Sequence, residues 1–425
     1  MKKKDFAEAG ALYFIATLFN KGIGFVTVPI FSRILTTSDY GTVTTFNSWV
    51  SMISVFISLA LYNAVRNSFV DMDDKERPHF LSTIITFTGL VFLTVMGVCV
   101  VATVFVPRNI NTALIFMCII QSFGYALIND YSYYLMMRYR YKFRAALMVL
   151  PGLISVVLSI FAILFILKDN LYLGRIVPTT AVYGIFAIVV LMAVYSKTKP
   201  ELNLDYLKYG LKIALPLVLH SIALQILSQS DRVMITSLRN AAETGVYSLV
   251  YNLSMIATVI TTSLDGIWVP WFTGKLKERK IREINVLAMD YVHLMTYAMV
   301  ALILVGPEIL KIFADQRYWE GMSIIPPIAL ANYMIFMYTM YVYIEHYYKK
   351  TVYITKNTLI AAGLNVILNF ILIPKYGYVA AAYTTLASYF VAFILHSRYA
   401  KKIEPDIYPL KMLSLIHISE PTRPY

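Results

Sequence analysis

The chain has 425 residues, of which 59% are hydrophobic and 14% charged, and its net charge is +13. A soluble domain carries about 25% charged residues, so this composition excludes an ordinary water-soluble protein and indicates a membrane protein. In that setting we expect the positive charge to lie in cytoplasmic loops rather than to bind nucleic acid.

Apolar stretches of similar length recur along the chain, separated by short polar loops. A bilayer core about 30 Å thick requires about 20 apolar residues per helical crossing, and lipid offers the backbone no hydrogen-bond partner. The fold class is therefore predicted to be all-α, a polytopic transmembrane bundle of about 12 spans. The expected spans are 10–33, 42–63, 81–106, 112–134, 146–167, 176–195, 211–229, 246–270, 286–306, 323–344, 357–373 and 378–397.

Basic residues alternate between dense and sparse loops along this series of spans. Arg138, Arg140, Lys142 and Arg144 follow one predicted span closely, whereas the next loop holds far fewer basic residues. Cytoplasmic loops of membrane proteins carry the excess of Lys and Arg, so the pattern predicts a multi-pass protein with a cytoplasmic N-terminus.

A proline-containing inner connection at Ser196–Glu201 divides the chain into two halves of six spans, predicted as bundles 1–198 and 199–410 around a central cavity. Thr37–Val43 and Ala242–Ser248 echo each other, since each polar turn ends at a glycine that opens the next helix. The alternative is that both are merely similar tight turns. Many secondary transporters are built from two such halves.

The last residues leave the pattern. Leu413–Ile416 begins like a span, but a polar, proline-containing ending follows. This ending resembles translated vector sequence, so we expect 411–425 to be a non-native tail and the natural protein to continue.

Catalytic motifs are scarce: the chain has no Gly-rich phosphate loop, no HExxH and no Cys-rich metal spacing. We therefore predict no enzyme activity, no cofactor and no metal site. The candidate functional residues are instead ionisable groups in or near spans, where a charge costs about 2.5–3.5 kcal/mol on insertion scales and so requires a cavity or a partner.

Three cations are candidates for binding an anionic substrate. Lys21 lies near the middle of the first span, where it either faces a water-filled cavity or pairs with a carboxylate on another helix. Arg232 follows Asp231 at the end of the seventh span and is either a cavity cation or part of a local structural pair. Arg66 follows the second span and either meets a headgroup phosphate or only sets the topology.

Four further groups are candidates for binding a coupling proton or sodium ion: Asp130, Asp265, Asp290 and His293. Asp290 and His293 are three residues apart and share one helical face. The alternative for the three aspartates is that they lie close enough to the inner boundary to be solvated. Glu345 is expected to pair with the nearby basic cluster that contains Lys349 and Lys350.

Three segments together resemble a known family. They are Phe31–Gly41, with the pattern R-x-L-T-x-x-D-Y-G; Ala214–Pro216 followed by Ser230–Ile235 and Gly245–Ser248; and Asn365–Asn369 followed by Ile373–Gly377. Their order and spacing are similar to those of Wzx-type polysaccharide flippases, and the resemblance covers nearly the whole chain. It implies the multidrug/oligosaccharidyl-lipid/polysaccharide exporter fold, normally of 12 to 14 helices.

The resemblance implies a flippase that moves undecaprenyl-diphosphate-linked oligosaccharides to the outer leaflet of a bacterial plasma membrane by alternating access. The implied products are surface polysaccharides such as O-antigen, capsule or exopolysaccharide. The implied partners are the lipid-linked substrate, membrane lipids and other polysaccharide-assembly proteins, with no nucleic acid. The first and seventh spans are expected to form a lateral gate.

Three alternatives stay open. An ion-coupled multidrug extruder of the same fold requires a carboxylate cluster in one bundle. A membrane-embedded polysaccharide polymerase resembles chains with a long outer catalytic loop, which is not evident here. A non-catalytic scaffold of the assembly complex is the third alternative.

Overall fold

The computed structural model describes residues 23–103 and 112–409, and every regular element in those ranges is a helix. They include nine helical segments long and apolar enough to cross a membrane, and a shorter apolar helix at Ile23–Ile34. A helix satisfies its backbone hydrogen bonds within one segment, which is why such apolar stretches fold this way in lipid. The prediction of an all-α membrane bundle is confirmed.

The chain divides into two compact units, residues 1–245 and 246–425. The first unit contains α2 (Thr37–Ser58), α3 (Tyr62–Asp71), α4 (Glu76–Ala102), α5 (Thr112–Met137), α6 (Tyr141–Phe161), α7 (Leu171–Tyr195) and α8 (Leu204–Leu238). After α9 (Ala241–Ser254), the second unit contains α10 (Ile256–Lys277), α11 (Ile281–Phe313), α12 (Ile325–Tyr347) and α13 (Thr351–Ile403).

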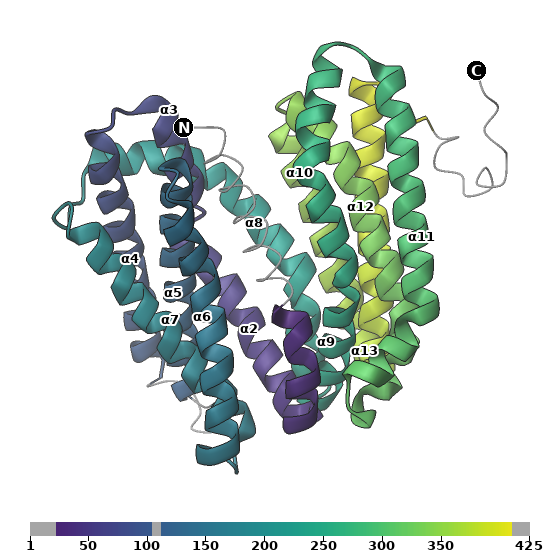
Figure 1. Cartoon of the computed structure of the whole chain (residues 1–425), viewed down its shortest axis with the longest axis horizontal. Coiled ribbons are helices and arrows are strands. Elements are labelled where there is room, and N and C mark those ends of the chain that lie inside the picture. The colour runs from purple at the N-terminus through teal and green to yellow at the C-terminus, as the bar shows by residue number, and fades with distance from the viewer. Residues whose placement is uncertain (1–22, 104–111, 410–425) are drawn as a thin grey trace. The chain divides into compact units, whose positions relative to one another are not determined.

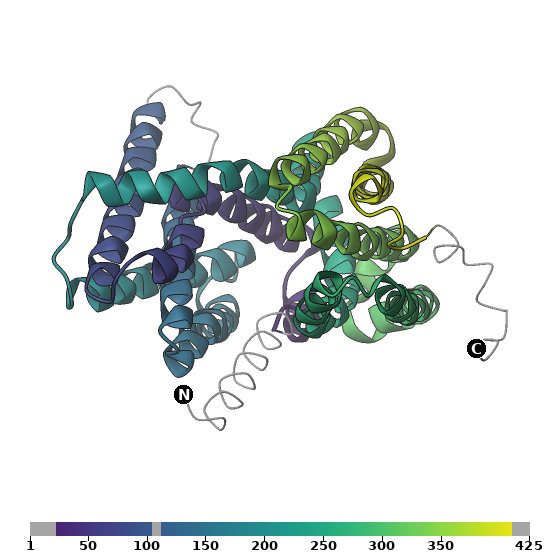
Figure 2. The same cartoon turned by 90° about the horizontal axis from the view of Figure 1, so that it is seen from above.

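Each unit is a bundle of neighbouring helices. In the second unit α10, α11, α12 and α13 run side by side, as the two views in Figure 1 and Figure 2 show. In the first unit α5 packs against α2, α4, α6 and α7, and α8 packs against α2, α3 and α4. The structure thus groups α8 with the helices before it, whereas the sequence boundary was expected at 198/199.

Several predicted spans are broken or joined. The span expected at 42–63 is two helices, because Leu59 and Ala60 adopt left-handed backbone angles, with φ of 45° and 53°. The Ser58 hydroxyl and carbonyl accept the amides of Ala60 and Leu61 at 3.2 and 2.9 Å, which satisfies the backbone at the break. The span expected at 246–270 is α9 followed by α10.

The two last predicted spans are joined in the long helix α13. Its interior contains Pro374, and Gly377 has φ of 64° and ψ of −153°, outside the helical region. Proline removes a helical hydrogen bond, and glycine adopts positive φ without steric cost. The kink therefore falls in the short segment from Pro374 to Gly377. The predicted division into 357–373 and 378–397 therefore corresponds to a kink rather than to a loop.

Two helix starts use the same capping chemistry. At α2 the Thr36 hydroxyl accepts the Asp39 amide at 3.0 Å, and the Asp39 carboxylate accepts the Thr36 amide at 3.3 Å. At α9 the Asn240 side chain accepts the Glu243 amide at 2.8 Å, and the Glu243 carboxylate accepts the Asn240 side-chain amide at 3.3 Å. The α2 pair satisfies two backbone amides at the helix start and the α9 pair satisfies one, and the first helical turn leaves such amides without partners.

The same two helix starts approach each other backbone to backbone. A Cβ built on Gly41 would lie 1.7 Å from the Ala241 carbonyl oxygen and 2.8 Å from the Gly245 nitrogen. A Cβ on Gly245 would lie 2.0 Å from the Thr37 carbonyl oxygen. The contact is reciprocal, and only glycine fits at either position.

Three turns at the expected inner side share one geometry. Tyr139, Arg279 and Lys349 have φ of 55°, 58° and 57°, and they join α5 to α6, α10 to α11 and α12 to α13. In each turn the following amide donates to a carbonyl five residues earlier, at 2.9, 3.0 and 2.8 Å. This is the Schellman pattern, in which glycine is the usual left-handed residue.

Charged side chains support the second of these turns. The exposed Glu278 lies beside Lys280 and Lys275, which lower its pKa. Glu404, just after α13, accepts hydrogen bonds from Arg279 and from the Tyr348 hydroxyl. Burial and the hydrogen bond to Glu404 raise the pKa of Tyr348 to about 12. The end of α13 is thereby fixed to the α10–α11 turn.

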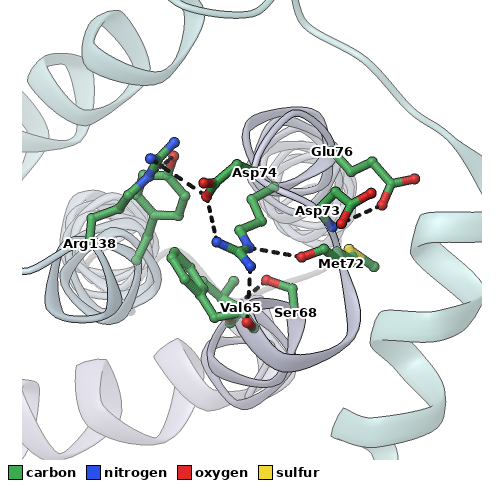
Figure 3. A network of polar contacts seen from close by, with 10 residues as sticks. Val65, Ser68, Met72, Asp73, Asp74, Glu76 and Arg138 are labelled. Carbon is green, nitrogen blue, oxygen red and sulfur yellow. Dashed lines mark hydrogen bonds and ion pairs between the residues drawn. The ribbon is translucent and has the colours of Figure 1, made fainter.

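An arginine closes the end of α3. Arg77 donates to the carbonyls of Phe69 and Met72 at 3.1 and 3.0 Å and to Asp74 at 2.5 Å. Asp74 also faces Arg138, at the end of α5, as Figure 3 shows. Since the last carbonyls of a helix have no partner within it, the guanidinium acts as a cap that joins three elements.

We expect Gly41→Ala to destabilise the first unit by about 3 kcal/mol or more, because the new methyl group meets backbone that cannot rotate away. Thermal unfolding of the full chain in detergent measures this effect. The matched control is Gly89→Ala in α4, where a Cβ meets nothing within 4 Å, so no loss is expected. Equal stability of the two variants would contradict the contact.

We expect Lys349→Gly to stabilise the protein by about 1 kcal/mol, because a left-handed L-residue costs about 1–2 kcal/mol that glycine avoids. The control is Lys350→Gly, where φ is −86° and glycine only adds flexibility to the unfolded chain. Thermal unfolding should therefore move in opposite directions for these neighbouring substitutions.

Candidate functional site

A cavity of about 830 Å³ lies inside the first unit, between the helix at Ile23–Ile34, α2, α5, α6, α7 and α8. Its size falls in the range of small-molecule binding sites. Its wall combines hydroxyl, amide and aromatic side chains with two arginines, Arg144 and Arg175. No Asp or Glu is among the residues that line this cavity, within the described ranges. The cavity lining is thus mixed polar and apolar, and the charged residues in it are arginines.

Arg175 lies one turn into α7. Its guanidinium donates to the Ser155 carbonyl at 3.4 Å and to the Ser159 hydroxyl at 3.2 Å, and it stacks over the Phe31 ring at 4.3 Å. These contacts use one terminal nitrogen and one face of a fork that has five donors. The remaining donors are available for an anion in the cavity.

Arg144 lies at the other end of the cavity, one turn into α6. It lies close to the Tyr133 phenol, and Arg66 on α3 lies close to the same phenol. Tyr133 stacks on Tyr62, with ring centroids 4.8 Å apart. Ser155, which holds Arg175, is about 16 Å along α6 from Arg144. The cavity therefore has a cation at each end.

A belt of uncharged hydrogen bonds crosses the cavity wall between the arginines. Gln121 on α5 is fully buried, accepts the Thr180 hydroxyl at 3.1 Å and donates to Asn47 at 3.4 Å. Tyr125 and Tyr183 stack nearby, with centroids 4.2 Å apart. The belt joins α2, α5 and α7 and presents both donors and acceptors to the cavity.

The predicted substrate cations lie in different places. Lys21 falls outside the described residues. Arg66 is exposed on α3 and lies near the cavity mouth through Tyr133. Arg232 is buried and donates to the Ser228 carbonyl of its own helix at 2.7 Å. It does not line the cavity.

The predicted coupling groups are also dispersed. Asp130 is completely buried on α5, and the Thr88 hydroxyl and the Tyr62 amide lie beside it without meeting hydrogen-bond geometry. The alternative of a solvated Asp130 is therefore wrong. Asp265 lies near the hydroxyls of Tyr291 and Tyr343 in the second unit.

On α11, Asp290 is exposed and His293 is half-buried. The structure thus brings neither residue of this pair into the described cavity. Among the residues that the structure describes, no group of three or more His, Cys, Asp and Glu side chains could hold a metal ion.

Two buried polar networks lie in the second unit. Asn369 donates to Asn365 at 3.2 Å and accepts from Thr384, which joins the two parts of α13. Glu345 on α12 forms a 2.8 Å contact with His396 on α13. The expectation that Glu345 pairs with the Lys349 cluster is wrong, because its side chain turns into the bundle.

A family model described as "Polysaccharide biosynthesis protein" matches residues 6–274. The chain belongs to this polysaccharide biosynthesis protein family. It is also similar to "Lsg locus putative protein 1" of Haemophilus influenzae, with 20% identity over 285 residues, which cover 64% of this chain and 66% of that protein. The chain thus spans slightly less than two thirds of that relative.

Solved transporters share the fold of this polysaccharide biosynthesis protein. The lipid II flippase MurJ in an inward closed conformation has a TM-score of 0.70 and 16% identity, covering 95% of this chain and 89% of that one. An inward-facing multidrug resistance MATE transporter of the MOP superfamily has a TM-score of 0.62 and 12% identity, covering 94% and 96%. The predicted exporter fold is confirmed, and the family match confirms that the resemblance lies with polysaccharide biosynthesis proteins.

The sequence places Arg144 in a basic loop, and Arg175 directly before the span expected at 176–195. The spans were expected to begin at 146 and 176, but α6 and α7 begin at Tyr141 and Leu171. Each arginine therefore lies inside a helix. The apolar residues that directly follow each arginine are the sequence signal that could have placed these arginines inside helices.

We expect Gln121→Leu to destabilise the first unit by about 1–3 kcal/mol, because it leaves the Thr180 hydroxyl without its acceptor and the Asn47 Oδ1 without its donor. Thermal unfolding in detergent measures the loss. Gln225→Leu is the matched control, since Gln225 lines the same cavity and its described hydrogen bond, from the Ser228 hydroxyl, is accepted by its backbone carbonyl rather than by its side chain. A larger loss for the control would contradict the proposed belt.

Proposed function

We propose that the protein is a flippase that moves undecaprenyl-diphosphate-linked oligosaccharide repeat units from the cytoplasmic to the outer leaflet of a bacterial plasma membrane. The observation that carries this proposal is the cavity of about 830 Å³ in the first unit, which is lined by two arginines and, in the described ranges, by no acidic residue. Family membership and the shared transporter fold support it.

The diphosphate is the part of this lipid that cannot cross hydrocarbon unaided. An isolated charge in an apolar medium costs far more than any single binding interaction returns, so the path must supply compensating cations. Guanidinium groups bind phosphate oxygens through two parallel hydrogen bonds. Arg144 and Arg175 place such groups at the two ends of one cavity.

The remaining wall suits the sugars. The Tyr125–Tyr183 and Tyr62–Tyr133 stacks present apolar ring faces with hydroxyl edges, and Gln121 adds amide donors and acceptors. A sugar ring likewise combines apolar faces with hydroxyl groups, so these surfaces match its chemistry. The polyprenyl tail would remain in lipid while the sugars and the diphosphate cross through the cavity.

Under the predicted topology, Arg144 and Arg66 lie near the cytoplasmic end and Arg175 lies near the outer end. We propose that the diphosphate first meets the former pair and is then transferred to Arg175. Lys21 and Arg232 stay proposed additional cations. Asp130, Asp265, Asp290 and His293 stay proposed coupling groups; of these four, Asp130 lies in the first unit and is completely buried.

The alternative is an ion-coupled multidrug extruder, and a multidrug resistance MATE transporter is among the solved structures that share this fold. Cationic drugs favour a negative cavity, because a positive wall repels them in a medium of low dielectric constant. The arginine-lined wall therefore supports an anionic substrate over a cationic one.

We expect Arg144→Gln and Arg175→Gln each to slow lipid transport by about tenfold or more, which corresponds to the loss of one charge-assisted hydrogen bond of about 1.5–3 kcal/mol. The measurement uses purified full chain in liposomes with fluorescent lipid-linked oligosaccharide. In a strain that lacks the gene, the same variants should fail to restore surface polysaccharide, and complete repeat units should accumulate on undecaprenyl diphosphate.

The matched controls are Arg140→Gln and Lys168→Gln, because both side chains are exposed near the same helix ends and neither lines the cavity. Unchanged transport is expected for both. Normal polysaccharide in the deletion strain, together with sensitivity to cationic drugs, would favour the extruder. Unpolymerised single units at the surface would favour a polymerase.

A further inference from the structure

The second unit contains one acid–base pair that is wholly removed from solvent. The Glu345 carboxylate and the His396 Nδ1 are 2.8 Å apart, and both side chains are completely buried. Glu345 lies on α12 and His396 on the second part of α13, so the pair links two helices. Neither residue belongs to the cavity of the first unit or to the coupling groups predicted from the sequence.

The surroundings of the pair offer little that could compensate a net charge. The Tyr338 and His396 rings stack with centroids 5.5 Å apart, and the further titratable side chains near the pair are those of His346 and Tyr399. The buried cluster that includes Ile344 draws apolar residues from the other packed helices, such as Leu276 of α10 and Ile284 of α11. His346 is itself exposed.

In this environment, only one charge state of the Glu345–His396 pair can be buried at a low free-energy cost. With one proton shared between carboxylate and imidazole the pair is neutral overall, whichever atom holds the proton. Without that proton the site is a buried anion, and with a second one it is a buried cation, and either state costs several kcal/mol. The pair can therefore be buried as it is here only when it carries one proton.

We propose that Glu345 and His396 form a proton-binding site of the second unit, and that exchange of this proton couples transport to the proton gradient. A proton binds between Glu345 Oε and His396 Nδ1 when the pair is hydrated, and it is retained when the helices close around the pair. Because the pair can be buried only when it carries the proton, closing of the helices depends on proton binding. Such a dependence is the requirement for coupling.

Two features bear on how the pair would exchange its proton. Glu345 Oε1 and His396 Nε2 are buried and make no hydrogen bond with any described residue, so each retains one position for a further proton donor or acceptor. Glu345 also lies about 3 Å along the helix from the end of α12, beside the Lys349 turn. A small opening at this end would hydrate the pair.

The coupling role rests on the proposed flippase function, and the transport assay above tests it. We expect an imposed pH gradient to change the wild-type rate on the order of tenfold, a usual size for coupling between two sites. Glu345→Gln and His396→Gln should move lipid at the gradient-free rate under both conditions. The double variant Glu345→Gln/His396→Gln keeps a neutral hydrogen-bonded pair and so protects against misfolding.

The controls are His346→Gln and Glu278→Gln, which remove exposed groups of the same types and should respond to the gradient as the wild type does. A double variant that still responds to the gradient overturns the coupling role while lipid transport stands. Wild-type protein that moves no lipid overturns the flippase proposal instead.

Proton binding itself is tested without any lipid substrate. Infrared spectra of the full chain in membranes, recorded as the pH changes, should show a pH-dependent carboxyl or carboxylate band that is absent in Glu345→Gln, or an imidazole band that is absent in His396→Gln, according to which atom takes the proton. Glu278→Gln should leave these bands in place. If neither Glu345→Gln nor His396→Gln loses a pH-dependent band, the proton site is refuted whether or not the protein moves lipid.

Discussion

The reciprocal backbone contact of Gly41 with Ala241 and Gly245 holds the starts of α2 and α9 together, at a distance that only glycine allows. Asp39, two residues before Gly41, caps its own helix and also accepts the Tyr172 amide at the start of α7 at 3.3 Å. A carboxylate is favourable at a helix N-terminus, so one side chain fixes two helices. Because Arg175 lies one turn into α7, the position of this cavity cation depends on the same contact.

The cavity and the buried acid–base pair both contain charges that need compensation, which a ligand would supply in the cavity and a bound proton in the pair. A charge in low dielectric must be compensated, and the cavity presents arginines that an anionic ligand would compensate. The pair of Glu345 and His396 compensates itself, but only with one proton present. The anionic substrate would thus compensate the arginines of the first unit, and the proton would compensate the charge of the Glu345–His396 pair in the second unit.

The spans were predictable because their apolar length is a property of the bilayer, and the loop charges add the expected orientation. The break at Leu59 and Ala60 was not, since neither residue is a usual left-handed or helix-breaking type and the break depends on packing. Arg144 and Arg175 were missed because helix ends are the least certain part of a sequence prediction. The partner of Glu345 lies 51 residues away along the chain, which no local pattern reveals.

The three left-handed turns at Tyr139, Arg279 and Lys349 also bear on how the chain is made. Each turn joins two long helices through a connection of about three residues, so the two helices are neighbours in sequence as well as in space. Such local contacts form early because little chain entropy is lost in closing them. During synthesis, α5 with α6, α10 with α11, and α12 with α13 would enter the bilayer as preformed hairpins, so insertion proceeds by helix pairs rather than by single spans.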